Sequence, residues 1–164
     1  MDERRERSEW VTLSFLPGLF NGPDKALGVA GGAVSFFTLK WKIAGNVFLS
    51  WTVLEVTLCG ALADSDMIYG TLSTGFHLPI YFGDDETHSM RFGVMLGGGA
   101  AGTKAGFVPT LEAEYRFQTQ GRIFFGVGGR LVLPAYTSSK TDFGSDRTTS
   151  FWGGGAILML RLGW

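Results

Sequence analysis

Apolar and polar side chains alternate with a period of two residues along most of this chain. Because the side chains of a β-strand point alternately to opposite faces, this period predicts strands with one apolar and one polar face. The clearest example is the segment 68–82, where large apolar residues alternate with Tyr69, Thr71, Ser73, Gly75 and His77. Similar alternation predicts an all-β chain with strands over residues 9–16, 25–42, 47–60, 68–82, 90–97, 107–117, 123–133 and 152–164.

The predicted strand 47–60 changes phase in its middle. Its apolar residues occupy odd positions up to Val53 and even positions from Leu54 onwards. A β-bulge near these two residues would keep one face apolar. It would place on the opposite face Ser50, Thr52, Glu55, Thr57 and Cys59. In the strand 25–42, we expect one unbroken apolar phase that comprises Leu27, Val29, Ala33, Phe37, Leu39 and Trp41.

The connections between the predicted strands alternate in length. Tight turns follow the second, fourth and sixth strands, whereas longer glycine-rich or polar segments follow the others, including 17–23, 98–106 and 136–150. Short turns at one end and longer loops at the other are typical of transmembrane β-barrels. We therefore predict an eight-stranded antiparallel up-and-down transmembrane β-barrel over residues 9–164, behind a charged tail of residues 1–8. Both termini would lie at the periplasmic, short-turn end.

Composition helps to decide which face of the strands meets lipid. Hydrophobic residues make up 45% of the chain and charged residues 18%, and 25 residues are glycine. No apolar run reaches the roughly 20 residues that a membrane helix needs. The apolar phases also hold more large side chains than the interior of an eight-stranded barrel can take, so we expect them to face outwards. A soluble, lipocalin-like carrier with an apolar interior remains the alternative.

The polar phases carry charged side chains that would then face the barrel interior. Charges inside a membrane protein are costly unless they are paired, so we expect an ion-pair network that plugs the lumen. A small channel or porin is the competing interpretation. The residues of the expected network are Lys40, Lys42, Glu55, Arg91, Glu112, Glu114, Arg116, Arg130 and Arg161.

Aromatic residues stand near the ends of the predicted strands. Aromatic rings favour the headgroup region of a bilayer, so these side chains would form interfacial girdles. The residues concerned are Trp41, Phe82, Phe107, Tyr115, Phe117, Trp152 and Trp164.

Several kinds of chemistry find little support in the sequence. A net charge of −1 gives no electrostatic basis for binding nucleic acid. One cysteine and two histidines make no recognisable metal site, and we expect neither a metal nor a cofactor. The segment 97–102 fits G-x-G-x-x-G, but no helix follows it to hold a pyrophosphate, so we interpret it as a surface loop.

A lipid A-modifying acyl hydrolase or transferase would need a serine, a histidine and a carboxylate near the outer leaflet. The expected topology places His88 in a periplasmic turn, and Ser73 and His77 at the wrong depth. We therefore expect His77 to be a hydrogen-bond partner in the lumen and the protein not to be an enzyme. Its role would be structural or interactive, through the loops or the periplasmic end, with a possible partner protein in the cell envelope.

The charged segment 1–8 lacks the apolar core of a signal peptide, which a secreted barrel needs. We interpret Met1 as an added start in front of a mature N-terminus. The other end of the chain alternates Leu158, Leu160, Leu162 and Trp164. This ending resembles the C-terminal signal of bacterial outer-membrane proteins, and the whole pattern resembles small barrels of the OmpA/OmpX type. The resemblance implies an outer-membrane location, contact with the lipid bilayer and recognition by the barrel-assembly machinery.

Overall fold

The computed structural model describes residues 9–21, 26–62, 68–82, 87–101, 104–119, 123–133, 135–140, 146–152 and 154–164. For residues 21, 101, 104, 135–140 and 146–152, the description is limited to the backbone. The predicted tail, residues 1–8, lies outside the described residues. No helix long and apolar enough to cross a membrane occurs in the part of the chain that is described.

Twelve strand segments form one continuous sheet. They are β1 Glu9–Phe15, β2 Gly18–Asn21, β3 Ala26–Ala44, β4 Val47–Ala61, β5 Ile68–Phe82, β6 His88–Ala101, β7 Lys104–Phe107, β8 Thr110–Gln118, β9 Phe124–Val132, β10 Ala135–Lys140, β11 Asp146–Trp152 and β12 Gly155–Gly163. Four of them prolong a neighbour in the chain. Both β1 and β2 pair with β3 and β12, and both β7 and β8 pair with β6. In the same way, β10 prolongs β9 and β11 prolongs β12, which leaves eight wall strands.

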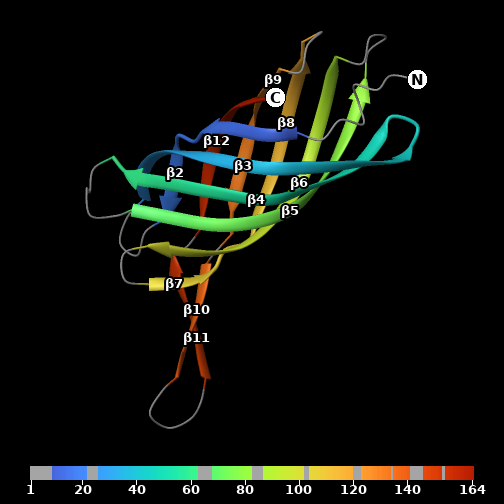
Figure 1. Ribbon diagram of the computed structural model, residues 1–164. Helices are drawn as coiled ribbons and strands as arrows, with labels where there is room; N and C mark the ends of the chain where they lie inside the picture. The colour runs from blue at the N-terminus through green and yellow to red at the C-terminus, as the bar shows by residue number, and fades with distance from the viewer. Residues whose placement is uncertain are drawn as a thin grey trace.

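The wall closes on itself through antiparallel pairings only. Successive neighbours are β1, β3, β4, β5, β6, β8, β9 and β12, and β12 pairs again with β1. The two ends of the described chain meet at this closure, where the Trp10 amide donates to the Trp164 carbonyl over 3.1 Å. A closed barrel leaves no open sheet edge along this circuit. The prediction of an eight-stranded antiparallel barrel is therefore confirmed (Figure 1).

The two ends of the barrel differ. One end, called here the turn end, carries the tight β3–β4 turn, where Gly45 adopts a φ of 50°, together with Glu9 and the C-terminus. At the opposite end, the loop end, the β10–β11 hairpin projects away from the wall (Figure 1). Six residue pairs join β10 to β11, whereas a single pair joins β10 to β7. The hairpin thus continues the barrel wall beyond its closed part.

Three neighbouring wall strands change phase at the same level. Two consecutive residues face outwards in each strand, namely Trp10 and Val11 in β1, Phe36 and Phe37 in β3, and Val53 and Leu54 in β4. Because β1, β3 and β4 are distorted at the same level, their residues pair in the same register on both sides of the distortion. The distortion shifts the register between β4 and β5, at Thr52 and Glu55. This confirms the predicted bulge in the strand 47–60. Phe37 absorbs part of the distortion with a φ of 55°.

The phase change in β3 corrects one prediction from the sequence. Leu27, Val29 and Ala33 were expected on the outward apolar face, but they are buried inside the barrel. The residues that follow the distortion, including Trp41, do face outwards. A bulge reverses the face of every residue on one side of it, so unbroken alternation assigned the first half of the strand to the wrong face.

The predicted loops also need correction. Residues 18–21, 98–101, 104–107, 135–140 and 146–152 belong to strands, so the glycine-rich segment 97–102 is largely wall and the segment 136–150 is largely hairpin. Glycine and serine have weak strand propensity, yet backbone pairing with a neighbouring strand satisfies their amides and carbonyls. That pairing overrides the local composition.

Candidate functional site

The lumen holds a charged network to which every wall strand contributes. These side chains are buried because they occupy the inward phase of their strands. They are Glu9 on β1, Lys40 on β3, Glu55 on β4, His77 on β5, Arg91 on β6, Glu112, Glu114 and Arg116 on β8, Arg130 on β9, and Arg161 on β12.

At the turn end of this network, three cations surround one carboxylate. Lys40 Nζ and Arg116 Nη1 both lie 2.7 Å from Glu9 Oε1, and Arg91 Nη1 lies 3.9 Å from Glu9 Oε2. Arg116 also reaches Glu114 through Nε, at 3.0 Å from Oε1. Glu9 is the first described residue of the chain, and it links β1 to β3, β6 and β8 across the lumen.

Towards the loop end, the proportion reverses, because three carboxylates surround two arginines. Arg130 Nη2 lies 2.6 Å from Glu55 Oε1 and also contacts Glu112. Arg161 Nη1 donates to Glu114 Oε2 over 2.9 Å, and its Nη2 lies 3.6 Å from Glu55 Oε2. Hydroxyl groups complete the shell, since Ser35 donates to Glu55 over 2.8 Å. Pairing of this density offsets much of the cost of taking these charges out of water.

His77 lies between the two charged groups. Its Nδ1 is 2.6 Å from Arg91 Nη2, and its Nε2 is 3.3 Å from Glu112 Oε2. A guanidinium group can only donate, so Nδ1 accepts and Nε2 carries the proton. His77 is therefore a neutral bridge from the cation Arg91 to the carboxylate Glu112. The hydroxyl group of Ser50 donates to the His77 carbonyl over 3.5 Å rather than to the ring.

Glycines on the inward phase make room for these long side chains. A Cβ on Gly93 would stand 1.9 Å from His77 Cδ2, and a Cβ on Gly126 would stand 2.0 Å from Glu114 Oε1. Both distances are shorter than any real carbon contact. The high glycine content of the chain thus serves the filling of the lumen.

An apolar cap covers the network at the loop end. Ten buried residues pack together there, with Ala61 against them: Leu16, Phe20, Val29, Ala33, Cys59, Tyr69, Val108, Val132, Ile157 and Met159. The rings of Phe20 and Tyr69 meet edge to face at 5.3 Å. Apolar side chains that are buried against each other leave little space for water.

An aromatic lid covers the network at the turn end. Phe48, Tyr81 and Phe124 are buried there, and the rings of Phe48 and Tyr81 meet edge to face at 5.3 Å. The lid contacts the charges directly, because the Arg116 guanidinium lies 4.1 Å from the Phe124 ring centre and Lys40 donates to Tyr81 over 3.4 Å. The lumen is therefore covered at both ends.

The structure places the expected site residues as follows. Eight of the nine expected lumen charges face inwards, whereas Lys42 is exposed near the β3–β4 turn. The expected girdle residues Trp41, Phe82, Phe107, Tyr115, Phe117 and Trp164 are exposed on the outer face. The side chain of Trp152 lies outside the described residues.

Sequence reasoning missed Glu9 and most of the apolar cap. Simple alternation in β1 places Glu9 on the same face as the exposed Leu13 and Phe15, and the phase change at Trp10 and Val11 turns it inwards. The sequence did contain a signal, because a carboxylate costs far more free energy on an apolar outer face than inside the barrel.

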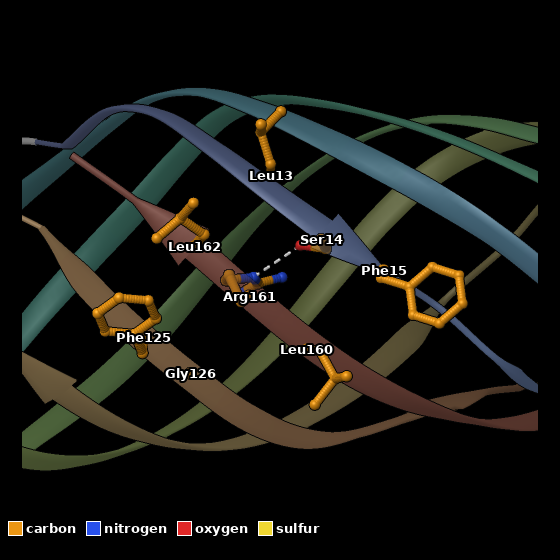
Figure 2. Close-up of a pocket in the computed structure, with 8 residues that line it drawn as sticks. All are labelled: Leu13, Ser14, Phe15, Phe125, Gly126, Leu160, Arg161 and Leu162. Atoms are coloured by element: carbon orange, nitrogen blue, oxygen red, sulfur yellow. Dashed lines mark hydrogen bonds between the residues drawn. The ribbon is translucent and has the colours of Figure 1, made fainter.

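The outer surface carries a shallow apolar groove at the barrel closure. It has a volume of about 450 Å³ and lies where β1, β12 and β9 meet, between Leu13, Phe15, Phe125, Leu160 and Leu162 (Figure 2). Behind the wall, Arg161 Nε donates to Ser14 Oγ over 3.0 Å.

Among the described residues, no group of three or more histidine, cysteine, aspartate or glutamate side chains is placed to hold a metal ion.

Comparison with solved structures identifies the type of barrel. The crystal structure of Neisserial surface protein A (NspA) matches with a TM-score of 0.63 at 9% identity, over 96% of this chain and 98% of that chain. The outer membrane protein AlkL, solved in DMPC lipid bilayers, matches with a TM-score of 0.45 at 11% identity, over 96% and 90%. No protein-family model and no curated protein matches the sequence. The match to NspA shows that the chain has the fold of the small, eight-stranded outer-membrane β-barrels.

Proposed function

We propose that this protein is an integral β-barrel of the bacterial outer membrane that does not conduct ions and has a structural or interaction role. The observation that carries the proposal is the lumen, which is crossed by ion pairs and hydrogen bonds between side chains from all eight wall strands and is covered at both ends. A filled lumen offers no continuous path for water, so transport is the less favoured role.

The outer surface supports the membrane location. Large apolar side chains cover it on every wall strand, such as Phe15 at 54%, Leu72 at 60% and Phe125 at 53% exposure. An exposed apolar belt that surrounds the whole barrel would cause aggregation in water, but it suits the hydrocarbon core of a bilayer. Aromatic residues gather near the turn end, where His88 Nδ1 and the Tyr115 hydroxyl lie 2.6 Å apart among Phe82 and Phe117. Such amphipathic groups favour the headgroup region.

The interaction role is best assigned to the loop end. The β10–β11 hairpin stands clear of the closed wall there, and binding segments are often carried by projections from a rigid scaffold. The chain entering β12 would then come from the cell exterior, with both termini on the periplasmic side. During biogenesis, the barrel-assembly machinery would be the partner of the C-terminal strand.

Single-channel recording in planar bilayers tests the proposal. The wild-type protein, refolded in detergent and verified by a heat-dependent shift in gel mobility, should give no unit conductance steps. The control is the Glu55→Ala/Arg130→Ala variant, which removes an ion pair with a 2.6 Å contact, keeps the net charge and widens the lumen. Steps in the variant alone would support a plug, whereas reproducible steps in the wild type would overturn it.

A further inference from the structure

The charges at the turn end of the lumen are not balanced. Lys40 and Arg116 share one oxygen of Glu9, and Arg91 is 3.9 Å from the other oxygen. Arg91 makes its short contacts with neutral groups instead, namely Thr52 Oγ1 at 3.1 Å and His77 Nδ1 at 2.6 Å. Arg91 is therefore the cation with the poorest compensation in the network.

The whole described lumen carries one excess positive charge. Its buried cations are Lys40, Arg91, Arg116, Arg130 and Arg161, and its buried carboxylates are Glu9, Glu55, Glu112 and Glu114. His77 adds no charge, because its Nδ1 accepts from Arg91. A buried unpaired charge is costly, so the imbalance calls for a counter-ion.

Two buried N–H groups point to the position of that counter-ion. Three buried N–H groups, on Arg91 Nε, Arg116 Nη2 and Arg130 Nε, have neither a hydrogen-bond partner nor an ion-pair contact among the described residues. The first two belong to the cations that surround Glu9, and each of these two side chains is less than 10% exposed. Arg91 and Arg116 lie diagonally across the neighbouring strands β6 and β8, so their like charges repel each other. An anion in contact with both groups would satisfy the free N–H groups and relieve the repulsion.

We propose that the lumen binds one small monovalent inorganic anion, of the halide class, between the guanidinium groups of Arg91 and Arg116. One negative charge neutralises the described lumen, and a halide can accept from several N–H groups at once. The aromatic lid of Phe48, Tyr81 and Phe124 then separates the anion from the turn end. This inference concerns the filling of the lumen and does not depend on whether the barrel conducts.

Bromide provides the direct test. Crystals of the full chain grown in sodium bromide should show an anomalous peak in contact with both Arg91 and Arg116. Water at that position, or a carboxylate from Asp2, Glu3 or Glu6 of the tail, would overturn the proposal. A variant without residues 2–8 should keep the peak, because the site is formed by the barrel alone.

Stability provides the second test. The unfolding equilibrium constant of the refolded protein is measured against chloride concentration, with gluconate holding the ionic strength constant. Above the dissociation constant, a tenfold increase in chloride should lower the unfolding constant nearly tenfold if one anion binds only the folded state. No dependence in the wild type would overturn the proposal.

Two variants make this second test specific. Arg91→Met should abolish the chloride dependence, since it removes the excess charge and one donor. Lys42→Met removes the same charge from an exposed side chain at the same end of the barrel, and it should keep the dependence. Equal loss in both variants would show general screening and contradict the assigned site. If Arg91→Met does not refold, the bromide peak in the wild type decides the matter alone.

Discussion

At the scale of single residues, the stability of the lumen network depends on buried ion pairs. In such a pair, the loss of one partner costs more than the loss of both. Arg130 illustrates this, because it lies between Glu55 and Glu112 and no other described cation contacts Glu55 at less than 3.6 Å. Removal of one partner leaves a buried charge uncompensated, whereas removal of both leaves a neutral gap. The network is therefore more sensitive to single than to paired substitutions.

Arg130→Met should lower the free energy of unfolding by about 3 kcal/mol, because it leaves Glu55 and Glu112 with the longer contacts to Arg161, at 3.6 and 3.5 Å. The combination Arg130→Met/Glu55→Gln should recover part of this loss. Urea titration of the refolded protein followed by tryptophan fluorescence measures both. Lys42→Met, on an exposed side chain, is the control and should change little. A double variant less stable than Arg130→Met would contradict the role assigned to the pair.

Gly93→Ala should destabilise the barrel by about 1–3 kcal/mol, the usual cost of overpacking. The new Cβ would overlap the His77 ring, so Gly93→Ala should cost much less in a His77→Ala background than in the wild-type protein. Gly98→Ala is the matched control, since a Cβ at this neighbouring glycine of β6 meets nothing within 4 Å. The same urea titration compares the three. If Gly93→Ala and Gly98→Ala had equal effects, the close approach to His77 would not be real.

At the scale of elements, the joint phase change of β1, β3 and β4 decides which residues line the lumen. It brings Glu9, Thr38 and Thr52 into one inward row and Thr12, Ser35 and Glu55 into the next. Since the three strands distort in register, their pairing is kept while the polar face stays inwards on both sides of the distortion. The cationic cluster around Glu9 follows from this feature of the wall.

Phe37 allows the distortion to be tested, because its φ of 55° is unfavourable for a side chain with a Cβ. Phe37→Gly should be more stable than Phe37→Ala by about 1 kcal/mol, because glycine adopts this backbone at little cost. At Phe36, whose φ is not positive, the order should reverse and alanine should be the better residue. Thermal or urea unfolding of the four variants provides the comparison. The same order at both positions would exclude the left-handed backbone at Phe37.

At the scale of the whole molecule, side chains of four kinds occupy the lumen of the described barrel. Its filling has an aromatic lid, a cationic part, a carboxylate-rich part and an apolar cap, in that order from the turn end to the loop end. The apolar cap consists of buried aliphatic and aromatic side chains, although the outer face of the barrel is also apolar. It closes the lumen on the side of the projecting hairpin.

Cys59 reports on this closure, since its side chain is only 2% exposed and belongs to the cap. A water-soluble maleimide should leave Cys59 unmodified in the refolded barrel and label it fully in urea. Moving the thiol to the turn end, in a Cys59→Ala/Lys42→Cys variant, should give rapid labelling under the same refolding conditions, because residue 42 is exposed. Rapid labelling of Cys59 in the folded protein would mean that water enters the lumen through the cap.

Much of this arrangement could be predicted from the sequence because alternation is a local property. The number of wall strands, the outward face of β5, β6, β8, β9 and β12, and the inward position of charges such as Arg91 and Glu114 all follow from a period of two and the cost of charge in lipid. The bulge in β4 was also visible, because its apolar residues change from odd to even positions.

The remaining features depended on contacts between distant segments. The phase of β3 and the inward position of Glu9 are fixed by pairing with neighbouring strands. The residues just before Ser35 are small, so the inward and outward positions of β3 did not differ enough in polarity to reveal the bulge from the sequence. Strand pairing likewise extended the wall through residues 98–101, 104–107, 135–140 and 146–152, in segments whose composition favours loops. The sequence by itself determined which side chains are polar and how often they alternate. Only the tertiary structure decided where the alternation shifts, because a shift is stable only when the neighbouring strands share it.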